Sequence, residues 1–524
     1  MIQMPSIIYK FFKQWIPKGS TEEKKDPLPI TSSIDINVDK IKALFDNTYD
    51  LVFRNFMIGG ELNLNAALFF INGLTDKISV ENHILDPLTH QNRFDVYHND
   101  YDLFFRDLKS SILTLLDISD CFDLNEAIDG ILLGKTVLFI DRMPYGIVID
   151  NRKWKDRAIE QPFTEVVIKG SHEGFNETLV TSTSLIRRRL KTPLLTFEQF
   201  NIGSLTKTDV VIAYIRGIAN EKVLDEIKSR LSRIQVDGIL DSGYIEQYIE
   251  DAPISIFPTI GNTEKPDVVV SKLLDGRFAI IVDGSPTVLT VPFLFVEALR
   301  ASEDYYMSPV IASFLRLTRI LALFLVVYLP GLYIAISSYH QDIIPTHLML
   351  TMAASTEGVP FSPFIEVLMM STLFIILKEA GIRMPRAIGQ AVSIVGALIL
   401  GQAAVEAGFV SNPVVMITAL AGIGGFVIYP LNSATTILWF AFSVLGSIAG
   451  FFGILYGTIF LLIHLVSLRS FGSPYFSPIA PRTTEELVKD VFLRAPLWTL
   501  NTGPRAINWK KVDKGNVDKL KFKK

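Results

Sequence analysis

The feature of this sequence with the clearest chemical meaning is a carboxylate inside a long apolar stretch. Residues 387–411 are apolar enough to form a membrane span, yet they contain Gln402 and Glu406. A charged side chain in a span costs free energy and is typical of an ion or substrate path. At about 100° per residue, one face of a helix here would carry five pore-lining candidates: Val392, Val395, Ile399, Gln402 and Glu406.

Two interpretations of that face stay open. If several copies surround an axis, Val392, Val395 and Ile399 would form an apolar constriction that gates by dewetting, with the two polar residues around its outer mouth. Alternatively, Glu406 faces water at the membrane interface and the valines face lipid. The opposite face is rich in small residues, which predicts close helix packing. The packing candidates are Gln390, Ser393, Ala397 and Gly401.

A second group of reactive side chains lies just before the first long apolar stretch. It is the run Glu303, Asp304, Tyr305 and Tyr306. This position predicts that the run couples a hydrophilic head to a membrane part. An interfacial helix with aromatic anchors explains the same residues equally well.

A glycine-containing loop over residues 170–174 precedes a helix expected from about Asn176. Such a loop can offer backbone N–H groups to an anion, although its spacing matches neither GxGxxG nor GxxxxGK[ST]. The helix carries three consecutive arginines, for which we expect a solvated face or a docking face for acidic groups. These are Arg187, Arg188 and Arg189.

The sequence offers no catalytic constellation. Its seven histidines include no HExxH pair, and its one cysteine, Cys121, has no partner for a disulfide. We therefore expect no enzyme activity, no cofactor and no metal site. A net charge of −4 gives no electrostatic basis for binding nucleic acid.

The elements that must position these residues fall into two classes. Between residues 308 and 468 only ten side chains are charged in 161 residues, while the rest of the chain has ordinary soluble composition. This contrast predicts a multi-pass helical membrane domain behind a soluble head. Lysines and arginines flank one side of the spans, which places the head and the C-terminus in the cytosol. That orientation needs an even number of crossings, so residues 434–468 should break into two helices near Gly450 or Gly453.

The head contains an internal repeat. Residues 131–149 align with 273–291, and residues 65–88 resemble 208–231. Each copy has the pattern strand, helix, helix, glycine turn and two strands, which predicts a small α/β unit. The glycine after the last helix suits a left-handed cap, and the turn at Asp283 suits a hairpin.

We therefore divide the chain into six parts, by residue number. They are an N-terminal segment (1–33), a first α/β subdomain (34–158), a second α/β subdomain (159–296), an interfacial linker helix (297–310), a helical transmembrane domain (311–468) and a basic cytosolic tail (469–524).

Several long segments closely resemble the GerA family of bacterial spore germination receptor A subunits. They are GSHEGFNETLVTSTSLIRRRL (170–190), ILDSGYIEQYIED (239–251), PDVVVSKLLDGRFAIIVDGSPTVLTVP (266–292), EALRASEDYY (297–306), YHQDIIPT (339–346), residues 378–411 and HLVSLRSFGSPYFSP (464–478). Members often have Arg-Gly-Pro-Arg before the EGF triplet, whereas this chain has residues 169–172 reading Lys-Gly-Ser-His.

The resemblance implies a nutrient-responsive complex in the spore inner membrane. In it, the A subunit acts with a multi-pass B subunit and a C-subunit lipoprotein. The resemblance further implies a homo-oligomer that conducts monovalent cations as germination begins, which favours the pore interpretation of residues 392–406. Two alternatives stay open: a secondary transporter subunit, and a non-conducting signalling scaffold for the partner subunits.

Overall fold

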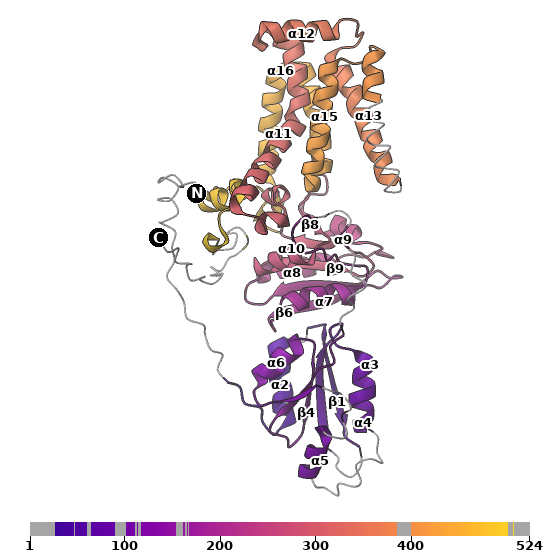
Figure 1. Ribbon diagram of the computed structural model, residues 1–524, viewed down its shortest axis with the longest axis vertical. Coiled ribbons are helices and arrows are strands. Elements are labelled where there is room, and N and C mark those ends of the chain that lie inside the picture. Colours follow the sequence, from indigo (N-terminus) through magenta and orange to yellow (C-terminus); the bar gives the residue numbers. More distant parts are fainter. Residues whose placement is uncertain are drawn as a thin grey trace, which may run out of the picture.

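The computed structural model describes residues 27–384, 400–500 and Ile507, apart from internal gaps at 47, 60–63, 90–100, 110–112, 114–116, 154–160, 163–164 and 166. Figure 1 shows an elongated molecule, with two stacked α/β units at one end and a bundle of helices at the other. The expected N-terminal segment before residue 27 and the basic end beyond Ile507 lie outside the described residues.

Each α/β unit contains a five-stranded antiparallel sheet. The first sheet has the order β1-β2-β4-β5-β3 and the second has the order β6-β7-β9-β10-β8. The first comprises β1 (Leu51–Met57), β2 (Asn65–Ile71), β3 (Ile118–Cys121), β4 (Thr136–Ile140) and β5 (Gly146–Ile149). The second comprises β6 (Leu195–Ile202), β7 (Thr208–Ile215), β8 (Gly261–Thr263), β9 (Phe278–Val282) and β10 (Val288–Val291). The identical order confirms the predicted duplication and the α/β class of the head.

Helices cover both faces of each sheet, which explains the nearly continuous apolar strands. In β2, Leu68 and Phe70 face one core, whereas Ala67 and Phe69 face the other. The helices of the first unit are α2 (Ile34–Phe45), α3 (Lys77–Val80), η1 (Glu81–Leu85), α4 (Asp86–Thr89), α5 (Tyr101–Asp107) and α6 (Leu124–Leu132). Those of the second are α7 (Leu179–Arg189), α8 (Glu221–Ser232), α9 (Ser242–Ile249) and α10 (Pro266–Leu274).

The turns follow the sequence expectations closely. Gly134 and Gly276, which follow α6 and α10, have φ values of 86° and 82°, so both adopt the predicted left-handed cap. The Asp283 turn joins β9 to β10 as an antiparallel hairpin, with Gly284 at φ 86°. The repeat pattern did not reveal the outer strands β1 and β6 or the short β3 and β8, because their apolar signal is weak.

The two head units are joined by a buried ion pair. Arg187 of α7 donates from Nε and Nη2 to Asp50, at 2.7 and 2.8 Å, and both side chains are at most 2% exposed. Thr48 adds a bridge, because its hydroxyl oxygen accepts the backbone N–H of Phe197 at 3.0 Å. The prediction of an exposed arginine face is therefore wrong for Arg187, which packs between the units.

The helical part begins with α11 (Pro309–Tyr339) and ends with α16 (Asn432–Ser467). Between them are η7 (Gln341–Ile343), α12 (Thr346–Thr356), α13 (Pro363–Arg383), α15 (Asn412–Val427) and η8 (Tyr429–Leu431). Among the described residues, Pro309–Tyr339 and Tyr429–Ser467 are long and apolar enough to cross a membrane. The exposed helix α12 lies across the far end of the bundle (Figure 1).

The chain reverses direction within α16. Ala449 and Gly450 leave helical geometry, with Gly450 at φ 57° and ψ −135°. Gly453 then packs against Leu445, and Gly457 packs against Phe442, which a continuous helix would hold far apart. The predicted break near Gly450 is confirmed. Each half has about 17 residues and is about 25 Å long at 1.5 Å per residue.

The segments beside the bundle differ from the expected linker and tail. Instead of one helix over 297–310, the chain forms two 3₁₀ helices, η5 (Phe295–Leu299) and η6 (Ser302–Tyr305), before α11 starts. The expected tail is, over 469–500, folded against the head. It forms β11 (Arg469–Ser470), β12 (Ser473–Pro474), α17 (Thr484–Glu486), η9 (Leu487–Phe492) and η10 (Leu497–Thr499).

Candidate functional site

The candidate site lies where η6 meets the first turns of α11. Four consecutive residues, Glu303 to Tyr306, each contact a different part of the molecule. We call this region the α11 junction. It comprises Arg300, Glu303–Tyr306, Arg316, Arg319, Asp490 and Arg494.

The outer two residues of the run hold the second head unit. Glu303 Oε1 accepts the backbone N–H of Ile168 at 2.6 Å. The Tyr306 hydroxyl donates to Asp267 Oδ2 of α10 at 2.7 Å. Burial and this hydrogen bond raise the pKa of Tyr306 to about 12, so its hydroxyl stays protonated and remains a donor.

Asp304 connects the run to the helical bundle. Its carboxylate is fully buried and accepts from Arg316 Nε at 3.0 Å and from Arg319 Nη1 at 2.8 and 2.9 Å. Both arginines belong to α11. Because a buried charge is tolerated only when paired and hydrogen-bonded, these contacts fix the first turns of α11 to η6.

Tyr305 connects the run to the C-terminal segment. Its hydroxyl donates to the two oxygens of Asp490 in η9, at 3.0 and 3.2 Å. Asp490 also pairs with Arg316 and Arg300, each at 3.0 Å. Burial first, and then the nearby Asp490 charge, raise the pKa of Tyr305 to about 12. The C-terminal segment therefore bridges the head and α11.

The glycine-containing loop packs against this junction. Gly170 lies so close to the Tyr306 ring that an added Cβ would approach it to 2.9 Å. Arg188 and Arg189 both pair with Glu173 of the loop, so these arginines hold the loop rather than form the expected open face. Helix α7 starts at Leu179, whose N–H donates to Asp283 Oδ1 at 3.0 Å. The helix N-terminus already has its anion, a carboxylate of this chain.

A second connection between head and bundle follows α16, and we call it the α16 junction. It comprises Glu226, Arg230, Asp251 and Phe471. Arg230 of α8 donates to Glu226 at 2.8 Å and to Asp251 at 2.7 Å, and its guanidinium lies 4.4 Å from the Phe471 ring. Asp251 also accepts the backbone N–H of Phe471 at 2.6 Å. The β11–β12 turn is thereby bound to the head.

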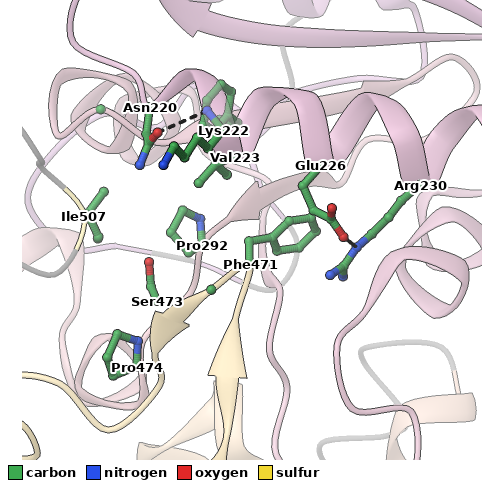
Figure 2. Close-up of a pocket in the computed structure, with 13 residues that line it drawn as sticks. Asn220, Lys222, Val223, Glu226, Arg230, Pro292, Phe471, Ser473, Pro474 and Ile507 are labelled. Atoms are coloured by element: carbon green, nitrogen blue, oxygen red, sulfur yellow. Dashed lines mark hydrogen bonds and ion pairs between the residues drawn. The ribbon is translucent and has the colours of Figure 1, made fainter.

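A cleft of about 460 Å³ lies beside the α16 junction, between α8 and the β11–β12 turn (Figure 2). Its walls mix apolar side chains such as Val223 and Phe471 with polar ones such as Asn220 and Lys222. Figure 2 shows Phe471 between the ribbon of β11 and the Glu226–Arg230 pair. The cleft therefore lies where the head contacts the segment that follows α16.

The structure describes only part of the predicted pore face. Gln402 and Glu406 are exposed on a short helical stretch, 400–406, while Gly401 is buried, and an added Cβ there would lie 3.6 Å from Val415 of α15. The other candidates lie outside the described residues: Val392, Val395, Ile399, Gln390, Ser393 and Ala397. The assignment of a pore-lining face remains a prediction.

One buried and one partly buried charged side chain within the bundle were not singled out from the sequence. Glu366 is 1% exposed and accepts the backbone N–H of Ser411 at 2.7 Å. Lys378 Nζ donates to Asn432 Oδ1 at 2.8 Å. These contacts join α13 to the start of α15 at the far end and to α16 at the head end.

The sequence identified the run 303–306 from its position alone and missed its partners. Asp490 and Arg494 lie about 180 residues further along the chain, in a segment expected to be a free tail. The one available signal is an unusual set of arginines and aspartates that flank apolar stretches, which is typical of buried pairs but does not assign partners.

Comparison with known proteins gives a consistent result. The family model described as Bacillus/Clostridium GerA spore germination protein matches residues 39–506. A Bacillus subtilis protein named uncharacterized membrane protein YfkQ is 42% identical over 92% of this chain and 93% of its own length. Spore germination protein KA of Bacillus subtilis is 39% identical over 93% of this chain and 89% of its own. The crystal structure of the N-terminal domain of the A subunit of the Bacillus megaterium spore germinant receptor GerK3 is 34% identical, with a TM-score of 0.41, over 52% of this chain and 99% of that one.

Proposed function

Since this chain belongs to the Bacillus/Clostridium GerA family of spore germination proteins, we propose that it is the A subunit of a nutrient-responsive germination receptor. In this proposal the chain lies in the spore inner membrane with its head and C-terminus facing the cytosol. It assembles into a homo-oligomer, together with a multi-pass B subunit and a C-subunit lipoprotein. The oligomer opens to monovalent cations when the receptor is triggered.

The arrangement of the helices supports a multi-pass membrane domain. The bundle begins with α11 and returns to the head at the end of α16, where the His464 ring and the Ser255 hydroxyl lie 3.0 Å apart. Exposed apolar side chains cover the second half of α16, including Phe452, Tyr456 and Phe460. Such a surface is unfavourable in water and suits lipid or a neighbouring subunit.

The observation that carries the proposal is the α11 junction. A receptor that opens a path through its helices needs a physical connection from the head to those helices. Asp304 provides one, because it is fully buried and pairs with two arginines of α11. Its neighbours contact α10 and η9, so a displacement of the head acts directly on the first helix of the bundle.

The test is potassium efflux from liposomes that hold this chain with its B and C partner subunits. Val395→Ala should loosen the predicted constriction and produce a leak without any nutrient, because a smaller apolar side chain lowers a dewetting barrier. Arg383→Gln, an exposed charge on α13, serves as the matched control. Glu406→Gln should alter the selectivity between cations with little effect on assembly.

The outcomes separate three classes of protein. Leak at rates far above carrier turnover supports the gated channel and the predicted facing of residues 392–406. A tight Val395→Ala variant, in a preparation whose wild type conducts, moves the pore to another helix. Flux at carrier rates indicates a transporter, and no flux from verified complexes indicates a signalling scaffold.

A further inference from the structure

The α11 junction has more positive charge than its own carboxylates neutralise. Four arginines lie among three carboxylates there, which leaves one positive charge without a matching negative one. The arginines are Arg300, Arg316, Arg319 and Arg494, and the carboxylates are Glu303, Asp304 and Asp490. Such an excess is costly where the side chains are buried.

The side-chain oxygens of Asp304 and Asp490 already accept hydrogen bonds from this chain. Asp304 accepts from Arg316, from Arg319 through both oxygens, and from the backbone N–H of Ala301. Asp490 accepts from Tyr305 through both oxygens and pairs with Arg316 and Arg300. Each of the four carboxylate oxygens therefore already has at least one donor from this chain.

Three buried guanidinium N–H groups find no partner among the described residues. They are Arg300 Nε, Arg316 Nη2 and Arg494 Nε. Arg316 is 1% exposed and Arg494 is 4% exposed, whereas 17% of the Arg300 side chain is exposed. A buried donor of a charged group that has no acceptor destabilises the folded protein.

These donors belong to side chains gathered around one aromatic ring. The guanidinium carbons of Arg316 and Arg494 lie 5.4 and 5.9 Å from the centre of the Tyr305 ring. The pKa of Arg494 is lowered, first by burial and then by the positive charge of Arg316. An anion among these groups would relieve the repulsion and supply the missing acceptors.

We propose that the α11 junction binds a phosphate group through Arg300, Arg316 and Arg494. Phosphate fits because it brings one or two negative charges and several strong acceptor oxygens, and guanidinium groups match its geometry. The partly exposed side chains of Arg300 and Asp490 form the open edge of the site.

The phosphate group has two sources, a phospholipid headgroup or dissolved phosphate. The position favours lipid, because exposed apolar side chains of α11 begin next to the site at Val310, Ile311 and Phe314. Headgroup phosphates lie at the boundary where such an apolar surface starts. The lipid source rests on the proposed membrane placement of α11, whereas the dissolved source does not.

The test uses the full chain and measures binding without nutrient or ion flux, so failure of the channel proposal leaves it intact. In one arm, inorganic phosphate is titrated into protein in an uncharged detergent, at constant ionic strength against chloride, and the unfolding temperature is followed. In the other, native mass spectrometry counts lipids retained from nanodiscs of phosphatidylglycerol or of a phosphate-free diglucosyl lipid.

The wild type should bind at least one of these probes. Arg494→Gln and Arg300→Gln should each weaken that binding about 10- to 100-fold, the range for one charge-assisted hydrogen bond. Arg494→Lys should recover part of it, and the control Arg383→Gln should bind as the wild type does. Arg300→Gln keeps the test valid if Arg494→Gln does not fold, because Arg300 is only partly buried.

Retention of phosphatidylglycerol without an effect of inorganic phosphate identifies the lipid as the source. A rise in unfolding temperature with inorganic phosphate, and no preference between the two lipids, identifies dissolved phosphate. The proposal is overturned if the wild type binds neither probe, or if both glutamine variants bind as tightly as the wild type.

Discussion

The head is attached to the helical bundle at two junctions that have opposite electrostatic composition. At the α16 junction one arginine, Arg230, faces two carboxylates, and no donor of its guanidinium is left unpartnered among the described residues. At the α11 junction, four arginines lie among three carboxylates, and three buried N–H groups have no partner among the described residues. The first arrangement is complete by itself, whereas the second needs an acceptor from outside.

The two junctions therefore differ in whether their stability depends on an added anion. A junction whose hydrogen bonds are all internal holds the same geometry under any condition in which the protein is folded. A junction with an unmet requirement for an anion changes its stability when that anion arrives. In the proposed membrane placement, the α11 junction is the place where an anion at the membrane surface would act on the bundle.

The largest expected effect comes from removing the buried charge of the α11 junction. Asp304→Asn leaves the guanidinium groups of Arg316 and Arg319 without their shared carboxylate, which should cost about 3–5 kcal/mol of unfolding free energy. Denaturation of the purified chain measures it. Asp342→Asn, an exposed change on η7, should stay within about 0.5 kcal/mol of the wild type. Equal stability of the two variants would contradict a stabilising role for the Asp304 ion pairs.

The corresponding change at the α16 junction should cost less. Asp251→Asn weakens contacts to Arg230 and to the Phe471 N–H, but the pair is about one-fifth exposed, so about 1–3 kcal/mol is expected. The neighbouring Glu226→Gln should be nearly neutral, because Glu226 is half exposed and its pair lies on one helix surface. A loss for Asp251→Asn larger than that for Asp304→Asn would reverse the comparison.

A smaller effect is expected where one hydrogen bond is removed and the ring is kept. Tyr305→Phe loses the hydroxyl that donates to Asp490, while Arg300 and Arg316 still pair with that carboxylate. We expect a loss of about 1 kcal/mol, measured by urea unfolding in detergent. Tyr248→Phe on α9, which is 53% exposed, should show no change. No loss at Tyr305 would mean that water replaces its hydroxyl.

The smallest effect concerns the loop beside Tyr306 and depends on pH. Burial alone would raise the pKa of Glu173, but hydrogen bonds and charges from Arg189 and Arg188 hold that pKa below its ordinary value. The stabilisation is therefore present above the ordinary value near 4.3 and is lost as pH falls through the lower folded value.

Hydrogen exchange of residues 170–175 measures this loss. Exchange should rise on acidification below about pH 4, and Glu173→Gln should show the same increase already at pH 7. Glu177→Gln, which removes a nearby carboxylate outside this pair, serves as the control. Exchange in Glu173→Gln that matches the wild type at pH 7 would mean that the arginine pairs do not hold the loop.

How far sequence reasoning reached differs between local and long-range features. The strands and the left-handed Gly134 and Gly276 follow from patterns within a few residues, and the structure confirms them. The reversal at Gly450, which the structure also confirms, follows from the distribution of lysines and arginines along the spans. The prediction of an exposed arginine face was wrong for Arg187, because the sequence does not distinguish a buried arginine from an exposed one until its partner is known.

Sequence patterns are enough to predict the soluble head, the apolar helices and the local elements of this protein. Composition separates the head from the apolar helices, and local periodicity and glycine positions define strands, helices and turns, because those depend on short-range geometry. The partners in the buried Asp–Arg ion pairs, in contrast, are known only from the folded structure. Asp50 joins Arg187 across 137 residues, and Asp490 joins Arg316 across 174. Pairing at such separations is selected by packing of the whole chain, since any buried arginine would donate to any aspartate within reach.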